Sequence, residues 1–494
     1  MDVSLEFLGG LATSDNLTGS CTAISVSCGK KTTTILVDVG LVQGDVKNFF
    51  ANNSKLLKSI NPAKVDYVII THAHIDHVGL LPFLVNNGFK GKVLCTKQTA
   101  DLIPNMLADS FKIQRELAKR KCQHADERPR NKDRTSKETG PLFTERDVAK
   151  AINLIMKSGL TYKEQVKLSN QMTLKFYASG HILGGAISVL TMTEPKSKKV
   201  LRLGFSGDLG RQEGMLLYPP AVVKEPLDCW FTESTYGNKH HPERQPEVDE
   251  LFATITEAAS SGKKIIIPSF ALQRSQELIY LLTLAMKSGK IPDIPIYLDS
   301  PMSVKLTEVY AKYWDLGSFK NKHTLDFNPF NKENPYVQFI TDYEESIQLA
   351  GKMAPLIVIS GSGMCDAGRV RNHLRVNLPS DQTIVCLVGY MSPASLGRKL
   401  QGNPAKVNMN GQEVIIKAQI KLFQSFSAHA DCSEIVDYAK AVLSVEATGQ
   451  TIFILHGEET GSANLKQLLE AEFSPDGTQV VIPKEKEKLK IKVR

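Results

Sequence analysis

Long apolar runs, paired cysteines and a basic leader are all missing from this 494-residue sequence. No apolar stretch approaches the roughly 20 residues that a membrane-spanning helix needs, so we expect no membrane association. The opening residues MDVSLEFLGG carry Asp2 and Glu6 rather than Lys or Arg, and no apolar segment follows them. A secretory signal is therefore not expected either.

Cysteine never occurs as C-x-x-C, although the chain contains eight cysteines: Cys21, Cys28, Cys95, Cys122, Cys229, Cys365, Cys386 and Cys432. Several of them lie in apolar, strand-like runs such as KVLCT and TIVCLVGY. That setting is typical of buried small hydrophobic residues in a reducing compartment. We therefore expect a cytoplasmic protein.

The composition is otherwise ordinary for a soluble globular protein, with 42% hydrophobic and 23% charged residues. The length exceeds what one core usually organises, which predicts at least two domains or one domain inserted in another. The formal net charge of +8 is compatible with a polyanionic partner, but many basic proteins bind no nucleic acid.

The pattern of apolar residues divides the chain into three parts. Up to about 220, β-branched runs alternate with helical patterns, which indicates strands with helices packed outside. Between 221 and 400, strands and helices alternate regularly, and this favours an inserted α/β domain with a parallel sheet. From 401 to 494 the strand-rich pattern returns, so we expect the first domain to resume there. The basic segment 119–134 reads as an exposed loop.

The loop THAHIDHVGLLP, directly after the apolar strand YVII, carries the strongest signal. It places His72, His74, Asp76 and His77 within six residues. Imidazole and carboxylate are ligands that zinc accepts, and a metal-activated water is a reason for an enzyme to gather them.

Three more ligand candidates follow other predicted strands: His181 in GHILGG, Asp208 in GFSGDLG and His456 in TIFILHGEE. The glycines beside His181 and Asp208 let the backbone approach a metal closely. Together the seven side chains suffice for a two-metal site in which a carboxylate bridges ions about 3.5 to 4 Å apart.

With this spacing, H-x-H-x-D-H followed by His181, Asp208 and His456, the chain resembles the metallo-β-lactamase superfamily. The resemblance implies an α/β fold, the αβ/βα sandwich, with two zinc ions. Within it, His72, His74 and His181 would hold one zinc, Asp76, His77 and His456 the other, and Asp208 would bridge them.

The insertion after Asp208 resembles that of the β-CASP nucleases, which include the endonuclease of cleavage and polyadenylation. Their motifs match Glu233 in CWFTESTYG, His429 in FQSFSAHAD and His456. Histidine at the third position is typical of the RNA-acting members, whereas the DNA-acting members place valine there. The resemblance therefore implies a ribonuclease, and more specifically an endonuclease.

A phosphodiester requires an activated nucleophile, neutralised charge and a proton for the leaving oxygen. We expect a hydroxide that bridges the metals as nucleophile, with Asp76 orienting it. His429 is the candidate general acid because histidine titrates near neutral pH. Glu233 would fix the tautomer of His429 and favour its cation.

Substrate anchoring is expected in the inserted part. The turn SGSGMCDAG lies between a predicted strand and a predicted helix, where backbone N–H groups could hold a phosphate. The candidates are Ser360, Ser362 and Gly363 in this turn, and Arg274 and Ser427 by resemblance. Asp38, at the end of ILVDVG, could support a ligand histidine from behind.

Three alternatives remain open: a small-molecule hydrolase acting on a thioester or ester, a DNA nuclease, and a catalytically silent RNA-binding subunit. The first would need neither the inserted domain nor a paired His429 and Glu233, and the last would be expected to have lost ligands. RNA is the expected partner. A homodimer is left open, and the sequence specifies no protein partner.

Overall fold

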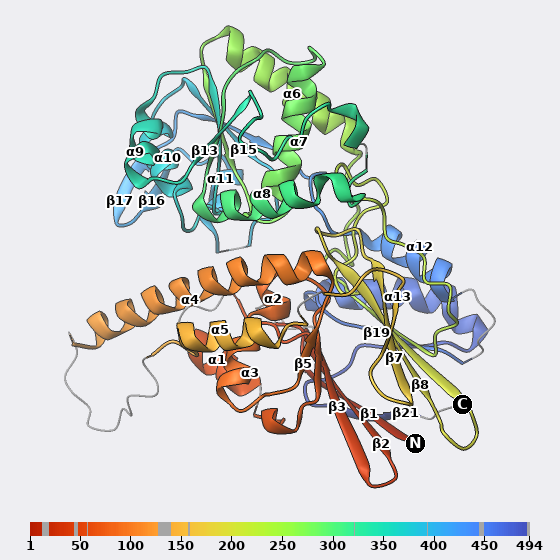
Figure 1. Cartoon of the computed structure of the whole chain (residues 1–494). Helices are drawn as coiled ribbons and strands as arrows, with labels where there is room; N and C mark the ends of the chain where they lie inside the picture. The colour runs from red at the N-terminus through yellow and green to blue at the C-terminus, as the bar shows by residue number, and fades with distance from the viewer. Residues whose placement is uncertain are drawn as a thin grey trace. The chain divides into compact units, whose positions relative to one another are not determined.

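The computed structural model describes residues 1–11, 19–43, 48–56, 58–126, 140–156, 159–320, 322–392, 394–443 and 449–491 (Figure 1). Two compact units make up the chain. The first combines Met1–Gln212, Pro219–His240 and His429–Arg494, and the second combines Glu213–Tyr218 and His241–Ala428. The second unit is thus inserted into the first along the sequence.

The first unit contains a six-stranded sheet in the order β21-β1-β2-β3-β4-β5. Antiparallel pairing joins β21, β1, β2 and β3, whereas β3, β4 and β5 are parallel. The strands are β1 (Asp2–Gly9), β2 (Cys21–Cys28), β3 (Lys31–Val37), β4 (Tyr67–Ile69), β5 (Lys92–Leu94) and β21 (Lys488–Ile491).

A seven-stranded sheet in the order β20-β19-β10-β9-β8-β7-β6 completes the first unit. Its strands β6 to β9 are antiparallel, and β9, β10, β19 and β20 are parallel. The strands are β6 (Gln165–Lys167), β7 (Met172–Ala178), β8 (Ala186–Thr193), β9 (Val200–Phe205), β10 (Cys229–Thr232), β19 (Thr451–Ile454) and β20 (Gln479–Val481).

The two sheets share one core, because buried side chains of both belong to a single hydrophobic cluster. Phe231 of β10 stacks between Phe205 and Phe453, with ring centroids 4.1 and 4.8 Å away. Phe7 of β1 reaches the same stack from the other sheet, 5.4 Å from Phe453. The inner faces therefore pack as a sandwich.

Helices cover the outer faces of this sandwich. Strand β8 shows why: Leu190 points into the shared core, while its neighbours Ile187 and Val189 are equally buried on the other side. There they meet α12 (Cys432–Leu443) and α13 (Glu459–Phe473). The first sheet has helices beside its β5 edge (Figure 1), namely α1 (Phe49–Leu56), α2 (Ile75–Val78), α3 (Leu81–Asn86), α4 (Lys97–Asp126) and α5 (Glu145–Leu154). This is the αβ/βα arrangement that the sequence predicts.

The second unit is built on a six-stranded, fully parallel sheet in the order β13-β12-β14-β11-β15-β18. The strands are β11 (Lys264–Pro268), β12 (Ile296–Asp299), β13 (Val337–Ile340), β14 (Leu356–Ser360), β15 (Thr383–Leu387) and β18 (Gln419–Leu422). Its helices are α6 (Arg244–Ser260), α7 (Arg274–Lys287), α8 (Pro301–Tyr313), α9 (Tyr343–Gly351), α10 (Val370–Asn377) and α11 (Leu396–Gln401). The four central strands β12, β14, β11 and β15 are fully buried, as expected for parallel strands covered on both faces, whereas the edge strands β13 and β18 are more exposed.

Two local expectations differ from the structure. The sequence pattern places the run GQEVIIKAQI in the returning first domain, but the run forms β17 (Gln412–Ile415), paired with β16 (Lys406–Met409), and the start of β18. Because β18 pairs in parallel with β15, residues up to Ala428 pack with the inserted unit in the structure. The exact domain boundaries stay a prediction.

The basic segment 119–134 is also not a loop throughout. Helix α4 continues to Asp126, since KRKCQHAD contains no proline or glycine to end it. Residues 127–134 lie outside the described residues.

In the described part of the chain, no helix combines the length and the apolar character that crossing a bilayer demands. Of the seven cysteines whose side chains the structure describes, six are buried, as predicted, Cys28 is partly buried, and none is in a disulfide.

Replacing Phe231 by alanine tests the shared core. Phe231 is only 2% exposed and stacks on two rings, so its loss should reduce the free energy of unfolding by about 3 to 5 kcal/mol. Leu468→Ala in α13 is the control, because Leu468 is 39% exposed and its loss should cost about 0.5 kcal/mol or less. Urea unfolding followed by circular dichroism measures both. Equal effects would contradict the sandwich packing.

Candidate metal centre

The candidate ligands lie where strands of the first unit end. His72 follows β4, His181 follows β7, Asp208 follows β9 and His456 follows β19. Strands β9, β10 and β19 are parallel neighbours, so the residues that follow them meet at one edge of the sheet. The remaining ligand candidates, His74, Asp76 and His77, lie in the loop after β4 and in the first turn of α2. Seven side chains from four separate segments of the sequence thus converge.

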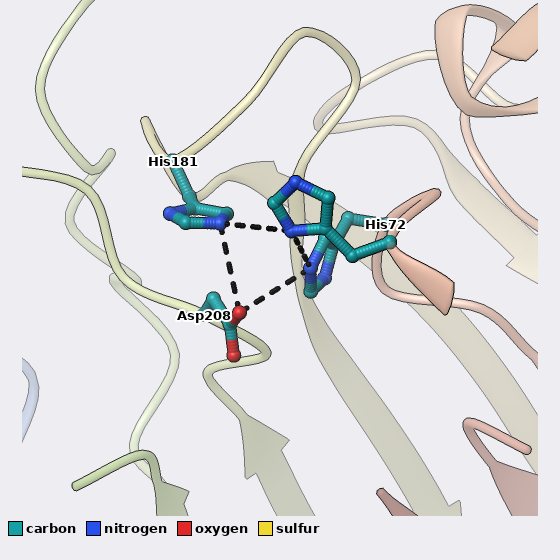
Figure 2. Close-up of side chains that lie close together, drawn as sticks. His72, His181 and Asp208 are labelled. Atoms are coloured by element: carbon teal, nitrogen blue, oxygen red, sulfur yellow. Dashed lines mark hydrogen bonds and ion pairs between the residues drawn. The ribbon is translucent and has the colours of Figure 1, made fainter. Parts of the chain in front are cut away.

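A first cluster contains His72, His74, His181 and Asp208. The side chains of His72, His181 and Asp208 point toward one another (Figure 2). His74 Nδ1 lies 3.1 Å from His72 Nε2 and 3.2 Å from His181 Nε2. Asp208 Oδ2 lies 3.3 Å from His72 Nε2 and 3.6 Å from His181 Nε2.

A second cluster contains Asp76, His77 and His456. Here His456 Nε2 lies 3.2 Å from His77 Nε2 and 3.5 Å from Asp76 Oδ2. The other oxygen of Asp208, Oδ1, lies 3.2 Å from His77 Nε2 and 3.4 Å from His456 Nδ1. Asp208 therefore presents one oxygen to each cluster.

The donor atoms of both clusters fit metal ions. Tetrahedral coordination with bonds of about 2.0 to 2.1 Å places ligand nitrogens about 3.4 Å apart, close to the spacings above. Asp208 is buried, and no described donor makes a hydrogen bond to its Oδ1. Buried carboxylate oxygens normally have a hydrogen-bond donor or a cation as partner. Among the surrounding imidazoles, a metal cation would be the partner of Asp208 Oδ1.

Burial sets the protonation of the first cluster. It lowers the pKa of His74 to about 3 and also lowers the pKa of His72 and of His181. These imidazoles are therefore neutral at pH 7, as a metal ligand must be.

In the second cluster, the pKa values of the histidines are raised rather than lowered. Burial opposes the charged form of His77, but the carboxylates of Asp208 and Asp38 outweigh it and raise the pKa of His77 well above its usual range. The pKa of His456 is likewise raised by Asp208 and Asp76 against the effect of burial. In the absence of metal, protons occupy the place of a cation here, so metal binding should release them and weaken at low pH.

Asp38 and Thr71 hold the ligand histidines from behind. The Nδ1 atom of His77 lies 2.8 Å from Asp38 Oδ2. Thr71 donates from its backbone N–H and its hydroxyl to Asp38, at 2.8 and 2.9 Å, and its hydroxyl lies 3.1 Å from His72 Nδ1. Such contacts fix the ring orientation and the tautomer of a ligand. The sequence prediction includes Asp38 but misses Thr71, although it directly precedes His72 at the end of the strand.

Glycine lets the ligand loops approach each other. A Cβ atom on Gly210 would lie 2.1 Å from the backbone carbon of Gly180, next to His181. A Cβ atom on Gly40 would lie 1.7 Å from the backbone oxygen of Asp76. No larger residue fits at either position without movement of the backbone. The predicted close approach around His181 and Asp208 is thus a contact between the two loops.

Glu233 and His429 form a pair beside the first cluster. Both carboxylate oxygens of Glu233 lie 3.1 Å from His429 Nδ1. The backbone N–H groups of Leu209 and Thr235 donate to the same carboxylate, at 2.6 and 3.3 Å. The ring of His429 is 4.3 Å from that of His181, centroid to centroid, and its side chain is 20% exposed. Burial disfavours the His429 cation, but Glu233 outweighs it and raises the pKa of His429 to about 9.

The five predicted substrate anchors lie in the second unit, and several of them have partners within that unit. Buried Arg274 forms an ion pair with Glu277 at 2.5 Å, and the hydroxyl of Ser360 donates to the backbone oxygen of Asp299 at 2.8 Å. Ser362 accepts a hydrogen bond from Ala367 N–H at 3.3 Å.

The other two anchors are packed closely. Gly363 lies against the ring of Phe270, and Ser427 is buried, with its backbone oxygen 3.4 Å from Arg244 Nη2. These contacts explain how the segments are held and leave their role toward a substrate as a prediction.

Known protein families match the chain in three places. Residues 16–147 match the metallo-β-lactamase superfamily, 275–400 match the β-CASP domain, and 413–483 match the Zn-dependent metallo-hydrolase RNA specificity domain.

Three relatives illustrate the match over the whole chain. A ribonuclease of Thermus thermophilus is 30% identical over 88% of this chain and 90% of its own length. An RNase J-like protein of Methanocaldococcus jannaschii is 29% identical over 89% and 91%, respectively. The cleavage and polyadenylation specificity factor subunit 3-I of Arabidopsis thaliana is 28% identical over 86% of this chain and 56% of its own length.

The sandwich and its histidine and aspartate clusters define the class, a metal-dependent hydrolase with the αβ/βα fold. The chain belongs to the metallo-β-lactamase superfamily, in its β-CASP group of nucleases. This fold implies binding of divalent metal at the clusters described above.

Removing metal should destabilise the protein. A chelator should lower the melting temperature by several degrees, because an ion bound only to the folded state adds to its stability, and added Zn²⁺ should restore it. Asp208→Asn is the control variant, since it weakens both clusters and should make the melting temperature insensitive to the chelator. An unchanged melting temperature of the native protein after verified metal removal would contradict a metal site at these residues.

Proposed function

We propose that the chain is a zinc-dependent ribonuclease that cleaves phosphodiester bonds within RNA. The observation that carries this proposal is the Glu233–His429 pair, which lies against a metal-ligand cluster of the first unit. A general acid in this position serves a leaving group that needs a proton, such as the oxygen of a phosphodiester.

Two zinc ions fit the clusters. His72, His74 and His181 would hold one, Asp76, His77 and His456 the other, and the two oxygens of Asp208 would reach both. Bound there, zinc supplies a lowered pKa for water and positive charge for the phosphate oxygens. The ligand set of neutral imidazoles and carboxylates is one that zinc accepts.

Within this site, His429 donates the proton to the departing oxygen. Its Nδ1 is held by Glu233, so Nε2 is the atom that would deliver the proton. Because the pKa of His429 is raised to about 9, the ring carries its proton at neutral pH. Glu233 is itself fixed by Leu209 and Thr235, which keeps the acid in one orientation.

Asp76 is the candidate for orienting the attacking water. Hydrogen bonding and charge from His456 and His77 lower the pKa of Asp76 against the effect of burial, so it remains an acceptor at neutral pH. Its side chain is partly exposed, at 16%, in contrast to the buried Asp208. A water can therefore reach it from solvent.

RNA is favoured over the alternatives by three observations. The relatives named above include two proteins whose names state ribonuclease activity, and one matched family model is an RNA specificity domain. His456 stands where the resemblance places histidine in RNA-acting members. A thioester hydrolase would not need the Glu233–His429 pair, since a thiolate departs without protonation.

Anchoring by the second unit forms part of the proposal. The turn from Ser360 to Gly363 follows β14 at the carboxyl end of the parallel sheet, where open α/β sheets commonly bind ligands. Ser362 is partly exposed and is the turn residue best placed to meet a phosphate. Arg274, Ser360 and Ser427 would need to exchange their present partners to do so.

The direct test uses RNA labelled at one end. The native protein with Zn²⁺ should produce internal fragments of mixed length, and chelation should abolish them. His429→Ala should reduce kcat about 10²- to 10⁴-fold, the usual contribution of a general acid, while bound metal stays unchanged. Mononucleotides alone would contradict internal cleavage, and full activity of the variant would remove His429 from the mechanism.

Glu233→Gln tests whether Glu233 raises the pKa of His429. Only protonated His429 can donate, so activity falls as the pH rises through its pKa. Removing the negative charge of residue 233 lowers that pKa, and the basic limb of the kcat profile should move to lower pH. Glu470→Gln in α13, where the side chain of Glu470 is 44% exposed, should leave the profile unchanged. An unshifted limb in Glu233→Gln would contradict the pairing.

A further inference from the structure

A third group of metal-binding side chains lies in the first unit, apart from the seven ligands above. It consists of His240, Asp431 and Cys432, whose possible ligand atoms all lie within 4.8 Å of one another. The sulfur of Cys432 is 3.5 Å from His240 Nε2 and 3.7 Å from Nδ1. These residues are separated by almost 200 positions in the sequence, so the fold brings them together.

The three donor types suit a borderline-soft divalent ion. A metal with a sulfur bond of about 2.3 Å and a nitrogen bond of about 2.0 to 2.1 Å, in tetrahedral geometry, separates the two donors by about 3.5 Å. The observed sulfur–nitrogen distance of 3.5 Å meets this requirement. His240 is exposed, so its ring can turn toward an ion without repacking of the core.

Asp431 contributes in two ways. Its Oδ1 caps the start of α12 by accepting from the backbone N–H groups of Ser433 and Glu434, both at 3.0 Å. This fixes the carboxylate close to Cys432. The carboxylate is 5% exposed and Cys432 is 1% exposed, so two of the three ligands are already held in place.

We propose that His240, Asp431 and Cys432 form a further site for one divalent transition-metal ion of the zinc type. The site joins two segments of the catalytic machinery. His240 lies in the loop between Glu233 and α6, and Asp431 and Cys432 follow His429. The backbone already links them through Cys432 N–H and Lys239 O at 3.2 Å. An ion here clamps the loop to α12 and so stabilises the Glu233–His429 pair. The proposal does not depend on which substrate the enzyme cleaves.

Cobalt(II) distinguishes this site from the main centre, because none of the seven proposed main ligands contains sulfur. The full-length protein, stripped of metal and reloaded with Co²⁺, should show a near-ultraviolet thiolate-to-cobalt charge-transfer band. Cys432→Ser should abolish the band and reduce bound cobalt from three ions to two per chain. His240→Ala, at an exposed position, should weaken the band without affecting folding. Cys122→Ser is the matched control and should retain it.

Two results would overturn the third site: no charge-transfer band in the native protein, or an equal band in Cys432→Ser. The outcome is separable from that of the main centre. In Cys432→Ser, the bound cobalt measures the main centre alone. Two cobalt ions per chain in this variant, together with no charge-transfer band in the native protein, would contradict only the third site. A band without those two ions would instead contradict the proposed two-metal centre.

Discussion

The Asp208 carboxylate lies between two groups of imidazoles and presents one oxygen to each. A buried carboxylate is costly unless cations or hydrogen-bond donors surround it. Around Asp208 the histidines provide these contacts, and they lower its pKa well below the ordinary value despite burial. In the proposed two-metal centre, the same carboxylate would bridge the two metal positions. Both histidine clusters of the site contact this residue.

The sandwich positions Asp208 through its strands. Parallel β9, β10 and β19 deliver Asp208, Glu233 and His456 at successive strand ends, and the stack of Phe205, Phe231 and Phe453 keeps these strands in register against the first sheet. Glu233 then links Asp208 to His429, the proposed general acid, since Leu209, the residue after Asp208, donates its backbone N–H to the carboxylate that holds His429. One carboxylate therefore connects the loop of Asp208 to the ring of His429.

Much of this site is predictable because its residues follow strands in short, distinctive segments. The H-x-H-x-D-H loop marks four candidate ligands in the sequence, and His181, Asp208 and His456, each after a predicted strand, complete the candidate set that the structure brings together. Asp38 is predictable for the same reason, as a carboxylate at a strand end. Thr71 is less so, because a threonine before a ligand histidine carries no signal until the distance to Asp38 is known.

Other features depend on tertiary contacts that local sequence patterns do not encode. The run 412–422 has a strand pattern that fits either domain, and only the pairing of β18 with β15 assigns it to the inserted unit. The cluster of His240 with Cys432 is invisible in sequence, since its members are distant and neither belongs to a recognisable metal motif.

Anomalous X-ray diffraction at the zinc absorption edge measures the central claim most directly. With Asp208 as a bridge, crystals of the zinc-loaded protein should give two strong peaks, about 3.5 to 4 Å apart, one beside each carboxylate oxygen of that residue. A single peak, or two peaks of which neither adjoins Asp208, would contradict the account.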